Sequence, residues 1–251
     1  MKGLSAITRR ELAGLFFQPL AWVLLCLALL VHGLFMALIL KQTGGDVRTT
    51  LISALGAGSF WLLTLLLAPL LTMRMISEES RSGLLEFLLT APVSDLAVVL
   101  GKQLAATAFF AILWTSTLLF AIGASLLGAE VDWGQLLVGY GGALLVSSLF
   151  CSIGLFASAL TQTPVLAAFL AFLIGLTMVM LPGVLSTYWT AAWGLDDRWL
   201  DAITSKFDLT ERYVNSFMLG ALDTGHLVFF LAWISLFVFL SVRLLEMRRW
   251  R

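Results

Sequence analysis

The sequence predicts an all-α integral membrane protein with six transmembrane helices, an N-terminal amphipathic helix at the membrane surface and a short helix in a cytoplasmic loop. Hydrophobic residues make up 60% of the 251 residues, and charged residues make up only 12%. A soluble domain carries about 25% charged residues, and at this length it could not bury so much apolar surface. The charged residues also separate apolar stretches of roughly 20 residues, the length at which a helix crosses a bilayer.

The boundaries of the six helices follow from these charge-free stretches. The stretch over 133–195 is too long for one span, and it divides at the polar turn 161–164, which contains a proline. We therefore expect a single transmembrane domain over 1–251, with an interfacial helix over 1–18, a loop over 74–102 and an outer segment over 186–225. The expected spans are 20–40, 51–73, 103–127, 136–160, 165–187 and 225–243.

The distribution of basic residues predicts the orientation in the membrane. An even number of spans puts both termini on one side, and basic residues concentrate in cytoplasmic segments. Ten of the fifteen basic residues would lie on the side of the termini, which we therefore expect to be cytoplasmic. These ten are Lys2, Arg9, Arg10, Arg74, Arg81, Lys102, Arg243, Arg248, Arg249 and Arg251.

The N-terminal stretch forms an amphipathic pattern of its own. Its basic residues point away from an apolar face, and the pair Gln18-Pro19 interrupts the pattern before the first span. This arrangement predicts a helix that lies on the cytoplasmic leaflet. The alternative is a cytoplasmic extension of the first span. The apolar face consists of Leu4, Ile7, Leu12, Leu15 and Phe16.

The six spans lack the ionisable side chains that ion-coupled membrane carriers usually need. Apart from Arg243 at the end of the last span, they contain no Asp, Glu, Lys or Arg, and His32 is the one histidine well inside a span. Ion-coupled carriers usually use intramembrane ionisable groups, and a single histidine is more often a packed residue. Cys26 and Cys151 lie in apolar runs, so we expect small buried side chains and no disulfide. Any energy for transport must therefore come from outside the membrane.

The loop over 74–102 is the strongest candidate for a functional element. Glu79, Ser82 and Glu86 form a polar stripe, and Leu84, Leu85 and Leu88 form an apolar face, as in a short amphipathic helix. Pro92 would end this helix, and Ser94 would cap the next one. We expect Glu79 and Glu86 to be exposed in the isolated subunit. Such a helix could transmit force from a docked soluble partner, and an ordinary solvated loop is the alternative.

The loop resembles the corresponding loop of ABC-2-type permeases, particularly those related to gliding-motility and nitrous-oxide-reductase-maturation transporters. One departure is Leu84, where the family usually has threonine. The matching positions are Glu78, Glu79, Arg81, Ser82, Gly83, Glu86, Leu88, Leu89, Thr90, Pro92, Val93, Ser94, Gly101 and Lys102. The resemblance implies a coupling helix that docks an ATPase through Glu78, Glu79, Arg81, Ser82, Gly83, Glu86, Thr90 and Pro92.

The resemblance also implies partners that this chain does not contain. Such permeases are multi-pass proteins of the bacterial cytoplasmic (inner) membrane that act as pairs, homodimeric or with a paralogue, together with ATP-binding-cassette subunits. The chain has no Gly-x-x-x-x-Gly-Lys-Ser/Thr motif, and Gly101-Lys102 lacks the phosphate-binding loop. We therefore expect no catalytic, cofactor or metal site here, with ATP and Mg²⁺ on the partner. The balanced charge gives no nucleic-acid footprint, and membrane lipids are the remaining expected partner.

Two further features have less specific interpretations. Ser147, Cys151, Gly154 and Ser158 recur at a spacing that predicts close helix packing, either within the bundle or at a subunit interface or substrate path. The outer segment mixes tryptophans with acidic residues, which predicts short surface helices that form an outer gate or bind an extracytoplasmic accessory protein. The rival interpretations of the whole chain are a membrane scaffold or anchor without an ATPase, and a channel.

Overall fold

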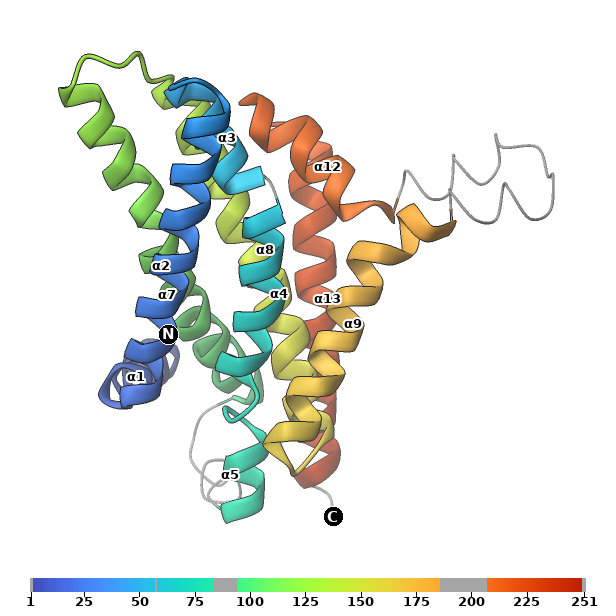
Figure 1. The fold of residues 1–251 in the computed structure, drawn as a ribbon. Helices are drawn as coiled ribbons and strands as arrows, with labels where there is room; N and C mark the ends of the chain where they lie inside the picture. Colours follow the sequence, from blue (N-terminus) through green and yellow to red (C-terminus); the bar gives the residue numbers. More distant parts are fainter. Residues whose placement is uncertain (1, 57, 84–93, 186–206, 250–251) are drawn as a thin grey trace, which may run out of the picture.

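The computed structural model describes residues 2–56, 58–83, 94–185 and 207–249, and within these ranges it contains helices and no strands (Figure 1). Six helical segments of the described chain are long and apolar enough to cross a membrane, which confirms the predicted class. The helices are α1 (Lys2–Phe17), α2 (Pro19–Gln42), α3 (Val47–Gly56), α4 (Gly58–Thr72), α5 (Ser77–Ser82), α7 (Asp95–Leu126), α8 (Trp133–Leu160), α9 (Pro164–Val184), α12 (Leu209–Ser216), the 3₁₀ turn η2 (Phe217–Leu219) and α13 (Thr224–Arg249).

Local signals at the helix starts explain most of these boundaries. Pro19 and Pro164 occupy the first turns of α2 and α9, where the missing backbone N–H has no intrahelical partner to lose. The Ser94 hydroxyl accepts a hydrogen bond from Ala97 N at 3.3 Å, so the predicted cap is confirmed. Helix α7 accordingly begins at Asp95, and the expected span over 103–127 corresponds to its later part.

The second span begins earlier than the expected 51–73. It contains α3, which begins at Val47, and α4, and residue 57 between them lies outside the described residues. Asp46 accepts backbone hydrogen bonds from Arg48 N at 3.0 Å and Thr49 N at 3.4 Å, which satisfies the start of α3. The side-chain hydrogen bond from Thr49 is the main cause that lowers the pKa of Asp46. The expected span rests on a stretch without charged residues, so it could not include Arg48, which lies in α3.

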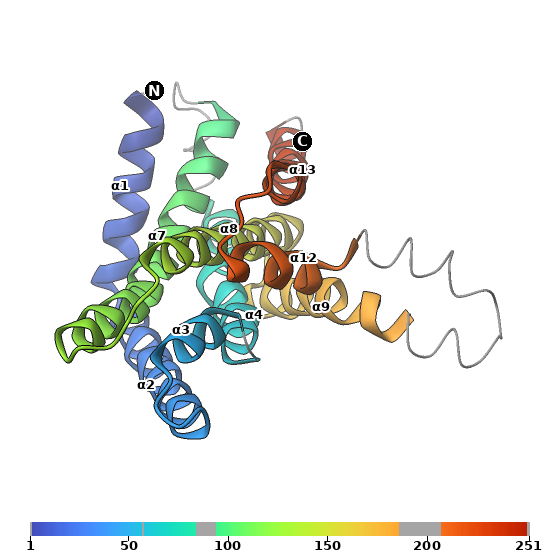
Figure 2. The same ribbon diagram turned by 90° about the horizontal axis from the view of Figure 1, so that it is seen from above.

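The helices define two ends of the bundle. In Figure 1, α5 and the last turns of α13 lie at the lower end, which we call the α5 end, and α3 and α12 lie at the upper end, which we call the α12 end. Helix α1 lies at the side of the α5 end and runs across the direction of the spans, as Figure 2 shows from above. Gln18 has an extended backbone between α1 and α2, so α1 is a separate helix and not an extension of α2.

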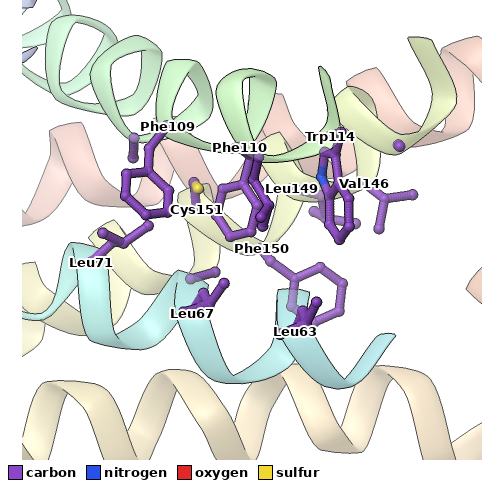
Figure 3. Packing of buried hydrophobic residues seen from close by; sticks show 14 of the residues in the cluster. Leu63, Leu67, Leu71, Phe109, Phe110, Trp114, Val146, Leu149, Phe150 and Cys151 are labelled. Atoms are coloured by element: carbon purple, nitrogen blue, oxygen red, sulfur yellow. The ribbon is translucent and has the colours of Figure 1, made fainter. Parts of the chain in front are cut away.

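Helix α8 lies at the centre, where it packs against α4, α7, α9 and α13. Figure 3 shows side chains of α4, α7 and α8 pointing toward one another in the core, among them Leu67, Phe110 and Cys151. Phe110 and Cys151 are fully buried. Cys26 is exposed on the outward face of α2, so the expectation that both cysteines are buried is wrong for Cys26.

Candidate functional site

Four charged side chains from three helices meet at the α5 end. We call Arg10 and Glu11 of α1, Glu79 of α5 and Lys102 of α7 the α1–α5–α7 ion cluster. The Lys102 side chain is 0% exposed, and its Nζ lies 3.1 Å from Glu11 Oε1 and 2.9 Å from Glu79 Oε1. A buried ammonium is stable only when it is paired in this way, because desolvation of an isolated charge is very unfavourable. The ion cluster therefore ties α1 and α5 to α7.

Arg10 completes the ion cluster from its exposed side. Its Nη2 donates hydrogen bonds to Glu11 Oε1 and, at 3.1 Å, to Glu79 Oε1. The hydrogen bond to Glu11 is the main cause that raises the pKa of the Arg10 guanidinium, and the charge of Glu79 adds to it. The two cations and two carboxylates balance, so the ion cluster carries no net charge. Glu79 Oε2 is buried and has no hydrogen-bond partner among the described residues.

Close packing of α1 against α7 places Glu11 beside Lys102. A Cβ on Gly101 would lie 2.7 Å from Ile7 Cγ2, so only glycine allows this approach. Ile7 is buried against α7, and Glu11 follows it by four residues on the same face of α1. Gly101 therefore permits the close approach of α1, and the next residue, Lys102, pairs with the Glu11 carboxylate of that helix.

The start of α5 is capped by a residue from another helix. The local N-cap residue, Ile76, has no side chain that could accept a hydrogen bond. Instead, the hydroxyl of Ser158 on α8 accepts hydrogen bonds from Ile76 N at 3.1 Å and Ser77 N at 3.0 Å, and it donates to Met73 O at 3.0 Å. Ser158 therefore stabilises the turn that connects α4 to α5.

The end of α5 differs from the expected amphipathic helix. Gly83 has a left-handed backbone with φ +75°, which ends the helix after Ser82. The expectation of one continuous polar stripe from Glu79 to Glu86 is therefore wrong, because the stripe is interrupted at Gly83. Glu86, Thr90 and Pro92 lie outside the described residues.

The predicted docking residues within the described part have two different environments. Glu78, Arg81 and Ser82 are exposed, as a docking surface requires. The side chain of Glu79 is only 20% exposed and pairs with Lys102, so the expectation of a free solvated carboxylate is wrong at this position. The cause is tertiary, since Lys102 comes from the next span.

The small-residue stripe of α8 lies inside this one chain. Ser147 accepts a hydrogen bond from Trp114 Nε1 at 3.0 Å, and Cys151 is fully buried in the core. A Cβ on Gly154 would overlap Thr72 Oγ1 of α4, so this glycine permits the close approach of α4 and α8. With Ser158 at α5, the stripe contacts α7, α4 and the turn before α5 in succession.

Comparison with known protein families identifies the family of this chain. A family model described as ABC-2 family transporter protein matches residues 49–246, which covers most of the chain and includes α5, Glu79 and Lys102. The chain belongs to the ABC-2 transporter family. It is thus the permease subunit of an ABC transporter, and the family implies association with an ABC ATPase subunit. No curated protein matches the chain.

The α12 end of the permease is held by buried aromatic residues and a polar contact. Tyr213 is fully buried, and its hydroxyl donates a hydrogen bond to Leu55 O at 2.8 Å. Burial raises the pKa of Tyr213 well above its ordinary value. Gln135 on α8 donates to Met218 O at 2.7 Å. Helix α12, which belongs to the predicted outer segment over 186–225, therefore packs into the end of the bundle, and the part of that segment over 186–206 lies outside the described residues.

Sequence reasoning identified Lys102 as a motif position but missed its partners. Glu11 and Arg10 looked like ordinary charges of a surface helix, and nothing in the spacing of the chain connects residue 11 with residue 102. The available signal was a lysine at the start of a long apolar run, which requires a carboxylate nearby if the lysine is buried. His32, by contrast, is packed as expected, with Nε2 2.9 Å from Thr117 Oγ1.

Within the part of the chain that the structure describes, no group of three or more His, Cys, Asp or Glu side chains could hold a metal ion. The arrangement at the α5 end is suited to the transfer of movement, because charged pairs connect three helices through one buried side chain.

Proposed function

We propose that α5 and the residues between it and α7 dock a separate ATP-binding-cassette ATPase, and that ATP hydrolysis there drives export or mechanical transmission across the membrane. The observation that carries this proposal is the pairing of Glu79 with the buried Lys102. Because this pair joins α5 to α7, a displacement of α5 by a docked ATPase is passed directly to a 32-residue helix of the bundle. Glu11 extends the same connection to α1.

The exposed residues of α5 supply the docking surface in this proposal. Arg81 is exposed, and no described side chain pairs with it. By resemblance to the gliding-motility and nitrous-oxide-reductase-maturation permeases, Glu86, Thr90 and Pro92 continue this surface. ATP and Mg²⁺ bind to the ATPase, and the permease works as a pair with a second copy or a paralogue. The complex lies in a bacterial cytoplasmic membrane with both chain termini on the cytoplasmic side.

The test is co-purification of the permease with a candidate ATP-binding-cassette ATPase from the same genome. We expect Arg81→Glu combined with Glu86→Lys to lower the amount of bound ATPase strongly, because loss of a partly desolvated charge pair costs roughly 2–5 kcal/mol at an interface. The thermal midpoint of the permease should remain unchanged, since Arg81 is exposed. Lys41→Glu is the matched control, because Lys41 is exposed at the α12 end.

Each outcome bears on the proposal. Normal docking and full ATPase stimulation in the double variant would show that this surface is only solvated. A wild-type permease that binds no ATPase would favour a membrane scaffold. A nucleotide-binding site on the permease itself would contradict the proposal that a separate subunit hydrolyses ATP.

A further inference from the structure

A cavity of about 710 Å³ opens at the α5 end between α1, α2, α4 and α5. Its size lies within the range of roughly 300–1,000 Å³ that is typical of small-molecule sites. Side chains of both kinds, charged and apolar, line it. The lining residues are Arg10, Glu11, Gly14, Leu15, Gln18, Leu20, Ala21, Leu24, Leu70, Leu71, Arg74, Met75, Glu78, Glu79 and Ser82.

The charges that remain available in this cavity are one cation and one anion. Arg10, Glu11 and Glu79 belong to the ion cluster, in which Lys102 balances the charge. Arg74 and Glu78 are exposed, and no described side chain pairs with either of them. They lie one turn apart, since Glu78 N donates a hydrogen bond to Arg74 O at 3.3 Å. The cavity therefore offers one cation, Arg74, and one anion, Glu78, which can pair with the anionic and the cationic group of a zwitterionic ligand.

The other wall of the cavity is apolar and faces outward. Leu20 is 40% exposed and Leu70 is 39% exposed, and Leu24 continues this surface along α2. Helix α1 lies across the spans beside the cavity (Figures 1 and 2). Its amphipathic sequence is typical of a helix at the level of lipid headgroups. A ligand that fills both walls needs a charged head and an apolar tail.

We propose that this cavity binds a phospholipid of the adjoining leaflet with a primary-amine zwitterionic headgroup, that is, a phosphatidylethanolamine. The phosphate pairs with Arg74, whose guanidinium offers planar donors to phosphate oxygens. The ammonium donates to the carboxylate of Glu78, and the acyl chains lie along Leu20 and Leu70. The bound lipid fills the space between α1 and α5, next to the ion cluster.

The chemistry of the pair discriminates among common headgroups. A primary ammonium has three N–H donors for the Glu78 carboxylate, whereas the quaternary ammonium of phosphatidylcholine has none. An anionic phosphatidylglycerol places a neutral glycerol against Glu78 and leaves that carboxylate without a cation. Loss of a hydrogen bond to a charged group corresponds to roughly a tenfold loss of affinity. We therefore expect phosphatidylethanolamine to be retained roughly tenfold better than either competitor.

The experiment measures the lipid that stays with the purified full chain. The permease is reconstituted in nanodiscs of equal parts phosphatidylethanolamine, phosphatidylcholine and phosphatidylglycerol, extracted in detergent, and examined by native mass spectrometry. We expect bound phosphatidylethanolamine to dominate. Glu78→Gln should reduce its retention to that of phosphatidylcholine, and Arg74→Gln should lower the retention of all three lipids. Glu130→Gln and Lys41→Gln, at exposed positions away from the cavity, should change nothing.

Three results would overturn the proposal. These are equal retention of the three lipids by the wild type, preference for phosphatidylglycerol, and undiminished preference in Glu78→Gln. Competition by soluble phosphoethanolamine as strong as that by the lipid would assign the site to a free phosphoamine instead. The comparison of the three lipids on the wild-type permease needs no variant, so it tests the proposal even if a variant folds poorly. The assay contains no ATPase and is independent of the proposed docking.

Discussion

Lys102 Nζ lies 2.9 Å from Glu79 Oε1, and this contact joins the short helix after the second span to the first turns of the third. The lysine side chain is completely buried, so its charge depends on Glu79 and on Glu11, whose Oε1 lies 3.1 Å from Nζ. Three segments that are separate in the sequence thus meet at one atom. The pairing holds α5 against the membrane bundle.

Replacement of Lys102 by Met should destabilise the permease by about 3 kcal/mol. The substitution leaves two carboxylates close together with one remaining cation, and breaking a buried ion pair costs about 3–5 kcal/mol. We take the lower end because Glu11 and Glu79 keep some contact with solvent. Chemical unfolding in detergent measures the change. Lys41→Met, at an exposed position, is the control and should have little effect; equal stability of both variants would refute the structural role of Lys102.

The neighbouring glutamates of α5 provide a matched comparison. Glu79→Gln should lower stability by about 2 kcal/mol, because it removes the negative charge that pairs with Lys102 and accepts a hydrogen bond from Arg10. Glu78→Gln should change stability by less than about 0.5 kcal/mol, since Glu78 is exposed. Thermal unfolding without added lipid compares the two variants. Indistinguishable midpoints would mean that Glu79 is as solvated as Glu78.

Ser158→Ala should loosen the start of α5. The substitution removes the acceptor of Ile76 N and Ser77 N, and loss of an N-cap costs about 0.5–2 kcal/mol. Hydrogen exchange of residues 76–82 should become faster while exchange in the middle of α8 stays unchanged. Ser152→Ala is the control, because Ser152 is buried on the same helix and donates only to Leu149 O of that helix. Faster exchange in both variants would argue against a specific cap.

Gly154→Ala should separate α4 from α8. The new methyl group overlaps Thr72 Oγ1, and overpacking of this kind costs about 1–3 kcal/mol. Gly141→Ala on the same helix meets no atom within 4 Å, so it should be neutral or slightly stabilising. Unfolding midpoints of the two variants give the difference. A stable Gly154→Ala variant would show that α4 and α8 do not approach closely.

The proposed orientation predicts which residues can be labelled from outside the cell. In a variant without Cys26 and Cys151, a cysteine at Glu130 should react with an impermeant thiol reagent in intact cells, and a cysteine at Arg81 should react only after lysis. Both positions are exposed, so access depends on the membrane side alone. Labelling in the reverse order would invert the topology.

The sequence by itself determined the class of the protein and the approximate position of each span. Apolar stretches separated by charges must cross a bilayer as helices, because only helices satisfy their own backbone there, and this argument requires no knowledge of neighbours. Pro19 and Pro164 set local boundaries in the same way. Ser94 was predictable as a cap because an N-cap acts within its own turn.

The tertiary structure decided which charges work together. Glu11 and Lys102 are far apart in the chain, and their pairing depends on the fit of Ile7 against Gly101, which no local pattern specifies. The same holds for Ser158, whose hydroxyl caps a helix two spans earlier. Hydrophobic periodicity and helix propensity depend on residues that are close in the sequence, whereas the burial of a charge depends on how the helices of the bundle pack. That is why Glu79 looked solvated in the sequence and is paired in the fold.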